Sequence, residues 1–284
     1  MTDNALSFAE LRNASQWDAP MQQALFALDM HGFTVIPDVL DAAEIQDLRR
    51  INERVHPQHG DDSRHYGAAG HITNLPRRDP GYWKVLDHPA ILPLLECVLG
   101  PDLIIASLNS RIIRPGDGPQ RFHSDVPPAL RRPGPPLMLN AIWMLDDFTI
   151  ANGATLIVPG SHMHAGNPDP GPKYARDDDH DQELRRAMFP APEVVRNVEG
   201  AAGSVIMFDG RCWHAGGHNS TDRNRHGLFA NYRQGTWMRF GADPHEGFAA
   251  DWHGQLNDRQ KRLMRMDRGV GYPTGSDYRE DPAE

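Results

Sequence analysis

The stretch RFHSDVP at residues 121–127 places a histidine and an aspartate two positions apart, His123 and Asp125. In an extended strand, residues i and i+2 point to the same face, so this imidazole and this carboxylate could reach one point in space. Such a pair could supply two ligands of a metal ion, or it could form a surface ion pair. The motif alone favours the ion pair, and a metal site requires a third ligand from elsewhere in the chain.

A candidate for the third ligand is His214, which follows an apolar run in FDGRCWHAGGHNSTDRNR. Two histidines and one carboxylate on one side of an iron ion leave its other positions open, which is the facial arrangement of non-heme Fe(II) oxygenases. The same three residues could hold zinc together with a water molecule. The ligand set therefore does not decide the metal.

Arg225, on the next expected strand after His214, bears on the choice of chemistry. A buried guanidinium is costly unless an anion pairs with it, and its forked donors match a carboxylate in a bidentate manner. Arg225 would suit a dicarboxylate, such as 2-oxoglutarate, whose other end chelates the metal. A surface arginine in a charged turn is an equally good interpretation of this residue alone.

The bulk composition limits the classes of function. With 39% hydrophobic and 24% charged residues among 284, the chain has the composition of a globular protein. Its net charge of −9 and pI near 5.9 give no electrostatic case for binding nucleic acid or an anionic membrane. No stretch approaches the roughly 20 apolar residues of a membrane helix, and the N-terminus lacks the apolar core of a signal peptide. We expect a cytoplasmic protein, monomeric or homodimeric, that acts on a small molecule.

The secondary structure that must position these residues is expected to change along the chain, from mainly helical to mainly β. Beyond residue 101, short β-prone runs separated by Gly, Pro, Asn and Asp predict a sandwich, jelly roll or barrel. Before it, GFTVIPDVL predicts a strand, and Asp41 with Glu44 forms a capping-box pattern at the start of a helix. We expect a single domain over 1–284, with a β core at about 101–240, a helical part at 20–100 and a tail at 241–284. The acidic segment 167–192 is expected to cover the mouth of the sheet.

Taken together, these motifs resemble the phytanoyl-CoA dioxygenase family of Fe(II)/2-oxoglutarate-dependent oxygenases. The resemblance begins at DMHGFTVIPDVLDAAEIQDLRRINE, continues through FHSDVP and WMLDDFTIANGATLIVPGSH, and ends in GSVIMFDGRCWHAGGHNSTDRNR. It covers roughly residues 25–235, and the pieces follow the family's order and spacing. The implied fold is mainly β with flanking helices: a double-stranded β-helix, which is a distorted, cupin-like jelly roll.

The resemblance also implies roles for individual residues. It implies iron ligation by His123, Asp125 and His214. Arg225 would clamp the distal carboxylate of 2-oxoglutarate, and the Thr155 hydroxyl would help. Two further residues are expected to line the cofactor pocket, Gln120 and Trp143, although Trp143 also fits a plain core position. The cofactor and co-substrates would be Fe(II), 2-oxoglutarate and O2. Members that halogenate carry a small residue in place of Asp125, so halogenation is not expected here.

The implied activity is that of an oxidoreductase, a dioxygenase that hydroxylates an unactivated C–H bond of a small metabolite in secondary metabolism and releases succinate and CO2. Desaturation, cyclisation or rearrangement remain open. The candidate substrate contacts are Arg64, His65, Tyr66, His71 and Asn74. Two alternatives also remain: a cupin-type isomerase or hydrolase that does not use 2-oxoglutarate, and a catalytically silent binding module. Arg225 and Thr155 argue against the first alternative, and the intact ligand set argues against the second.

Overall fold

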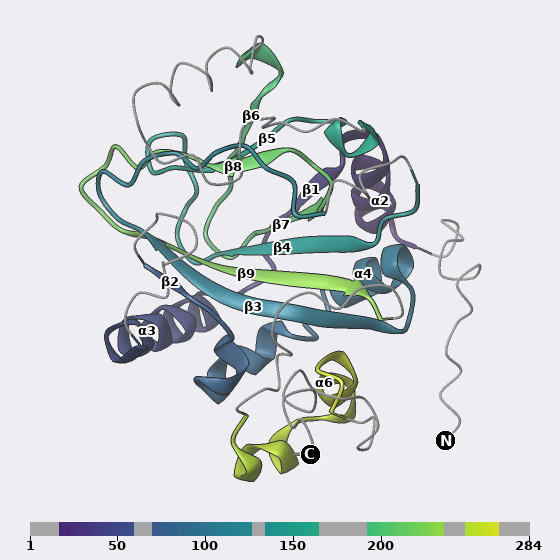
Figure 1. Ribbon diagram of the computed structural model, residues 1–284, viewed down its shortest axis with the longest axis vertical. Helices are drawn as coiled ribbons and strands as arrows, with labels where there is room; N and C mark the ends of the chain where they lie inside the picture. Colours follow the sequence, from purple (N-terminus) through teal and green to yellow (C-terminus); the bar gives the residue numbers. More distant parts are fainter. Residues whose placement is uncertain (1–16, 60–69, 127–133, 165–191, 236–247, 267–284) are drawn as a thin grey trace, which may run out of the picture.

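The computed structural model describes residues 17–59, 70–126, 134–164, 192–235 and 248–266. Within them, the strands form a six-stranded antiparallel sheet in the order β1-β7-β4-β9-β3-β2 and a three-stranded one in the order β6-β5-β8. Figure 1 shows the small sheet lying above the large one. The strands are β1 Phe33–Ile36, β2 His71–Ile72, β3 Leu103–Ile113, β4 Met138–Met144, β5 Thr155–Ile157, β6 Arg196–Val198, β7 Val205–Asp209, β8 His214–Gly216 and β9 Arg225–Gln234.

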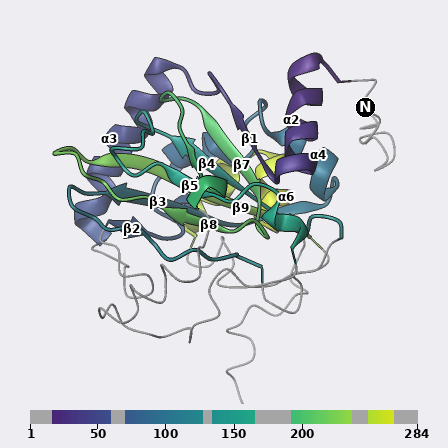
Figure 2. The same ribbon diagram turned by 90° about the horizontal axis from the view of Figure 1, so that it is seen from above.

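Helices cover the side of the large sheet that faces away from the small one. Figure 1 shows α3 and α6 below that sheet, and Figure 2, seen from above, shows α3 at one end and α2 and α4 at the other. The α-helices are α2 Ala19–His31, α3 Ala42–His59, α4 Leu92–Leu99 and α6 Asp258–Leu263. The 3-10 helices are η3 Leu75–Arg77, η4 Pro80–Val85, η6 Ser161–Met163, η7 Pro192–Val194 and η8 Ala250–Gln255.

The helix starts follow from local hydrogen bonding. The Glu44 N–H donates to Asp41 Oδ1 at 2.9 Å, and the Asp41 N–H donates to Glu44 Oε2 at 3.1 Å, which confirms the predicted capping box of α3. At the end of α2, Gly32 adopts a left-handed φ of 80°. A Cβ there would lie 2.4 Å from Cys212 Sγ, so a glycine is required where this turn contacts the chain that leads into β8.

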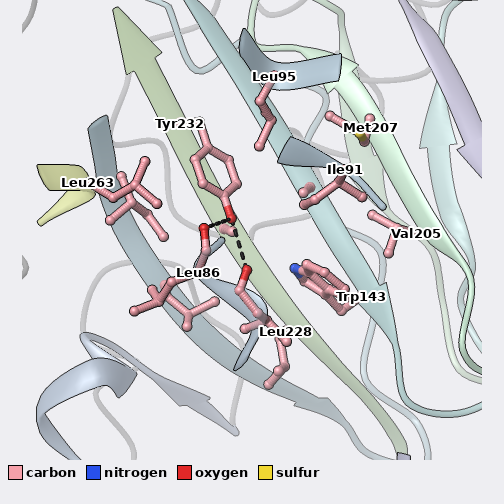
Figure 3. Close-up of a cluster of buried hydrophobic side chains, with 14 of the residues drawn as sticks. Leu86, Ile91, Leu95, Trp143, Val205, Met207, Leu228, Tyr232 and Leu263 are labelled. Atoms are coloured by element: carbon pink, nitrogen blue, oxygen red, sulfur yellow. Dashed lines mark hydrogen bonds between the residues drawn. The ribbon is translucent and has the colours of Figure 1, made fainter. Parts of the chain in front are cut away.

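The main core lies between the helices and the large sheet. Figure 3 shows Trp143 from β4 and Tyr232 from β9 packed among leucines and other apolar side chains of the surrounding elements. The Tyr232 hydroxyl donates to the carbonyl oxygens of Val85 and Leu86, both at 3.0 Å. These bonds tie the sheet to the end of η4 and satisfy a polar group that is fully buried.

The predicted fold class is confirmed as mainly β with flanking helices, but the boundary of the β core differs from the expectation. Both edge strands of the large sheet, β1 and β2, come from the N-terminal part. β1 confirms the strand predicted in GFTVIPDVL, whereas β2 was not predicted. β1 pairs with β7 and β2 pairs with β3. Because an edge strand can be only a few residues long, β2 gives too short a pattern to be recognised from sequence. None of the described helices is long and apolar enough to cross a bilayer.

Candidate functional site

Backbone pairing brings the two histidines of the candidate metal site together. The His123 N–H donates to the His214 carbonyl oxygen and the His214 N–H donates to that of His123, both at 2.9 Å. This isolated antiparallel bridge joins the HSD segment to the start of β8. The imidazole rings lie 4.2 Å apart between centroids. Residues distant in sequence thus meet because the small sheet continues into the segment that holds His123.

The carboxylate of Asp125 lies between the two imidazoles. Its Oδ1 is 3.7 Å from His123 Nε2, and its Oδ2 is 3.6 Å from His214 Nε2. The three side chains form a group whose ligand atoms all lie within 4.8 Å of one another. This geometry suits one metal ion held by two imidazole nitrogens and one carboxylate oxygen.

Carbonyl groups behind the histidines fix which ring nitrogen faces this centre. His123 Nδ1 lies 2.9 Å from the Arg121 carbonyl oxygen, and His214 Nδ1 lies 3.0 Å from that of Cys212. Because a carbonyl oxygen only accepts, each Nδ1 carries the proton and each Nε2 presents its lone pair to the centre. Burial is the main reason that the pKa of His214 is lowered to about 4, so its imidazole stays neutral and ready to bind a metal.

A chain of amide groups holds the carboxylate in place. Asn140 Nδ2 donates to Asp125 Oδ2 at 2.7 Å, and Asn231 Nδ2 donates to Asn140 Oδ1 at 2.6 Å. Arg233 Nε in turn donates to Asn231 Oδ1 at 2.7 Å. We call Asn140, Asn231 and Arg233 the amide relay. Because each acceptor in it is held by the next donor, the Asp125 carboxylate has little freedom to rotate away from the histidines.

The candidate metal centre opens into a cavity of about 350 Å³ between the two sheets. Of the residues predicted to surround a cofactor or substrate, it is lined by Gln120, Thr155, Arg225 and His71. Gln120 is fixed at one end, because its Oε1 accepts the Gly216 N–H at 2.9 Å. The cavity therefore joins the predicted metal ligands to the predicted anion clamp.

Arg225 is buried with an unsatisfied donor. Its side chain is 2% exposed, its Nε donates to the Asn152 carbonyl oxygen at 3.1 Å, and its Cζ lies 3.8 Å from the centroid of the Phe148 ring. Within the described residues, its Nη1 is buried and has no hydrogen-bond partner. Burial, followed by the charge of Arg111, lowers the pKa of Arg225 to about 9. A carboxylate at this position would satisfy both the charge and the donor.

The structure decides between the two interpretations of Trp143. Trp143 points to the helix side of β4 and is fully buried in the main core, whereas Ile142, one residue earlier, lines the cavity. Side chains alternate along a strand, so the prediction was displaced by one residue. Asn74 is not among the residues that line the cavity, but its backbone N–H donates to the Oδ1 of Asn109, which is, and its role as a substrate contact stays a prediction. Outside the described residues lie Arg64, His65, Tyr66 and nearly all of the segment 167–192.

Sequence reasoning missed several polar residues on the cavity side of the large sheet. These are Ser107, Asn109, Arg111, Asn140, Asn231 and Arg233. They occur at alternate positions of strands whose intervening residues are mostly apolar, with Ser110 of β3 as an exception. That pattern is the available signal, because a polar residue at every second position of a buried strand indicates a polar interior surface.

Known proteins share sequence with this chain. The family model described as phytanoyl-CoA dioxygenase (PhyH) matches residues 28–227. The dioxygenase af480 of Aspergillus fumigatus is 32% identical over 230 residues, which cover 75% of this chain and 66% of that relative, slightly under two thirds of it. The uncharacterized protein Mb1539 of Mycobacterium bovis is 30% identical over 217 residues, or 72% of each chain.

Solved structures share the fold at lower identity. The epimerase SnoN, in complex with Fe3+, alpha ketoglutarate and nogalamycin RO, superposes with a TM-score of 0.61 at 22% identity, covering 80% of this chain and 93% of SnoN. The alpha ketoglutarate dependent carbocyclase SnoK from nogalamycin biosynthesis superposes with a TM-score of 0.60 at 21% identity, covering 78% of this chain and 85% of SnoK. These likenesses support the predicted cupin-type jelly roll.

Proposed function

This chain belongs to the phytanoyl-CoA dioxygenase family, and from that premise we propose that it hydroxylates an unactivated C–H bond of a small metabolite, releasing succinate and CO2. Its class is that of the oxidoreductases that depend on iron and 2-oxoglutarate. The observation that carries the proposal is the convergence of His123, Asp125 and His214 in one cavity with the buried, unsatisfied guanidinium of Arg225.

The residues present fit both groups that the family requires. His123, Asp125 and His214 would hold the iron, because two Nε2 atoms and one carboxylate converge there. Arg225 would bind the distal carboxylate of 2-oxoglutarate, with Thr155 and Gln120 beside it in the same cavity. Bound together, iron and 2-oxoglutarate supply the activation of dioxygen that C–H oxidation needs.

The surrounding residues prepare the site for this chemistry. The carbonyl groups of Arg121 and Cys212 keep both imidazoles in the tautomer that binds a metal. Asn140 holds the carboxylate of Asp125. Ile142, Phe208 and Phe229 line the cavity with apolar surface, which excludes water and strengthens the electrostatic contacts of Arg225.

The proposal extends to the setting of the reaction. SnoN and SnoK come from nogalamycin biosynthesis, and their likeness to this chain supports a role in secondary metabolism. One of them is an epimerase and the other a carbocyclase, so the fold accommodates outcomes other than hydroxylation. We place the protein in the cytoplasm as a single-domain monomer or homodimer acting on a small molecule.

The test is an anaerobic titration of the purified protein with Fe(II) and then 2-oxoglutarate. We expect a visible metal-to-ligand charge-transfer band, because 2-oxoglutarate chelates the iron. A protein that binds the metal but gives no band would be a metal enzyme that does not use 2-oxoglutarate, such as an isomerase or hydrolase. A protein that binds neither would be a binding module of the same fold, and either result would overturn the proposal.

A further inference from the structure

A second arginine, Arg111 of β3, lines the same cavity. Within the described part of the chain, its guanidinium makes no hydrogen bond or ion pair, and its Nε is buried. Burial lowers the pKa of Arg111. Burying an arginine in such surroundings costs free energy unless an anion pairs with its guanidinium.

The pairing of β3 with β9 places Arg111 beside Arg225. Arg111 lies opposite Gly227, and Ile113 lies opposite Arg225, so the two arginines are diagonal neighbours on one face of the sheet. Such neighbours are roughly 7–8 Å apart along the backbone. Gly227 has no side chain to separate them. Two guanidinium groups therefore lie side by side at this end of the cavity. Asp117 and Asp146 act on Arg111 and Arg225 from a distance, but neither arginine forms an ion pair within the described residues.

The proposed cofactors neutralise one of these cations but not the other. Among the described lining residues, Asp125 is the single carboxylate, and it belongs to the metal centre. Asp125 and the chelating end of 2-oxoglutarate balance the two charges of Fe(II). The distal carboxylate of 2-oxoglutarate balances Arg225. Arg233, the third arginine of the lining, is hydrogen-bonded to Asn231 and lies in the field of Asp125. Within the described residues, Arg111 has the field of Asp117 but forms no ion pair, so its positive charge is the one left without a paired anion.

Neighbours of Arg111 add hydrogen-bonding groups for an oxyanion. His71 lies opposite Arg111 across the β2–β3 pair. Asn109 lies two residues before Arg111, on the same face. Its Oδ1 accepts the Asn74 N–H at 3.1 Å, which leaves its amide NH2 as the donor toward the cavity that Asn109 lines. These three side chains, Arg111, His71 and Asn109, form what we call the edge site.

We propose that the edge site binds a carboxylate of the primary substrate, with Arg111 as the residue that selects for it. This inference rests on the proposed function, because the charge balance includes iron and 2-oxoglutarate. The substrate class is a small organic acid with an apolar portion. The carboxylate pairs with Arg111, while Ile142 and Phe229 offer apolar contact in the same cavity.

The first experiment separates the edge site from a second clamp on 2-oxoglutarate. Affinity for 2-oxoglutarate is measured anaerobically, from the charge-transfer band, in the wild type, Arg111→Gln and Arg225→Gln. We expect Arg225→Gln to lose on the order of a hundredfold or more in affinity and Arg111→Gln to change less than about threefold. An equal loss in both variants would make Arg111 part of the co-substrate site and overturn the inference. If the wild type itself binds no 2-oxoglutarate, the proposed function fails instead.

The second experiment measures carboxylate binding without catalysis. The protein is loaded with Zn(II) and 2-oxoglutarate, and benzoate binding is measured by saturation-transfer NMR, with benzamide as the uncharged counterpart. We expect the wild type to bind benzoate at least about tenfold more tightly than benzamide. Arg111→Gln should abolish this preference, and Arg111→Lys, which keeps the charge, should retain part of it.

A matched control is Ser107→Ala, because Ser107 lines the same cavity on β3 but lies outside the edge site. This variant should keep the preference for benzoate. The inference would be overturned if wild-type protein showed no preference, or if Arg111→Gln and Ser107→Ala behaved alike. Thermal unfolding of each variant confirms that a loss of benzoate binding reflects the removed charge in a folded protein.

Discussion

The two faces of the large sheet are built from the same strands and serve opposite purposes. On the helix side, β4 and β9 present Leu139, Trp143 and Tyr232 to a packed apolar core. On the cavity side, the same two strands present Asn140 and Arg225. Neighbouring residues of a strand therefore point to opposite sides, one into the core that stabilises the fold and the next into the cavity of the candidate site.

This difference indicates how each face tolerates change. Some buried polar groups on the cavity side are hydrogen-bonded to one another, as in the amide relay. Others have a donor without a partner that an anion could satisfy, as in Arg225. Side chains on the helix side contribute by filling volume. Substitutions on the cavity side should therefore alter binding in a protein that still folds, and substitutions on the helix side should alter folding in a protein that still binds.

The largest effect is expected at the metal centre. His214→Ala removes one of three converging ligands and should reduce iron-dependent succinate formation to background, while the unfolding temperature changes little. Succinate is measured by NMR after incubation with Fe(II), 2-oxoglutarate and oxygen. His218→Ala is the matched control, because His218 is exposed just after β8 and its Nδ1 bonds to the Asp117 carbonyl oxygen. Near-normal turnover in His214→Ala would remove this residue from the site.

The next largest effect is expected at Arg225. Truncation to alanine leaves the distal carboxylate of 2-oxoglutarate unpaired in a buried site, at a cost of roughly 3–5 kcal/mol, or on the order of a hundredfold or more in affinity. Arg225→Lys should recover part of the loss, because an ammonium keeps the charge without the fork. Anaerobic titration with 2-oxoglutarate gives the dissociation constants.

Arg223 provides the control for this second prediction. It precedes Arg225 by two residues, but its side chain is 91% exposed and lies 3.8 Å from the Asp222 carboxylate. Arg223→Ala should leave the affinity for 2-oxoglutarate unchanged. If Arg223→Ala lost affinity and Arg225→Ala did not, the cavity assignment of β9 would be wrong.

Trp143 tests the opposite face. Trp143→Ala removes a fully buried ring from the main core and should lower the free energy of unfolding by roughly 3–5 kcal/mol. Affinity for 2-oxoglutarate, measured on the folded fraction, should stay at the wild-type value. Denaturant unfolding and anaerobic titration give the two quantities. Lost affinity for 2-oxoglutarate with an unchanged free energy of unfolding would place Trp143 in the cofactor pocket. It would also contradict the separation of roles between the two faces of the sheet.

The placement of Trp143 shows how much of a site can be predicted from the sequence. Sequence motifs located the three candidate ligands and Arg225, because each stands beside recognisable turn residues. The β class followed from the short runs between glycines and prolines. In β4 the local signal for the cavity face was a single polar residue, Asn140. The pairing of β4 with β7 and β9, which places that face over the cavity, is not contained in the local sequence.

Arg111 and Asn109 show a second limit. Both lie in the polar stretch Asn109-Ser110-Arg111 within an otherwise mainly apolar strand, and a charged edge strand would show the same pattern. Only the pairing of β2 with β3 on one side and β9 with β3 on the other makes the position of Arg111 internal. The composition of the cavity therefore depends on strand order, which local sequence does not encode.

The smallest predicted effect lies between the two extremes, at Asn140, whose side chain supports a ligand without being one. Asn140→Leu keeps the approximate volume but removes the 2.7 Å bond to Asp125 Oδ2, so the carboxylate gains freedom to rotate. Loss of such a supporting hydrogen bond typically costs about 10–100-fold in metal affinity.

Titration with Mn(II), which needs neither oxygen nor turnover, measures the dissociation constant directly. Leu139→Ile, on the helix side of the same strand and outside the residues that line the cavity, is the control and should leave Mn(II) binding unchanged. Because Asn231 acts on Asp125 only through Asn140, Asn231→Leu should weaken the metal less than Asn140→Leu does. Equal losses of Mn(II) affinity in the two asparagine variants would mean that the amide relay stabilises the sheet as a whole. The cavity side would then stabilise the fold, as the helix side does.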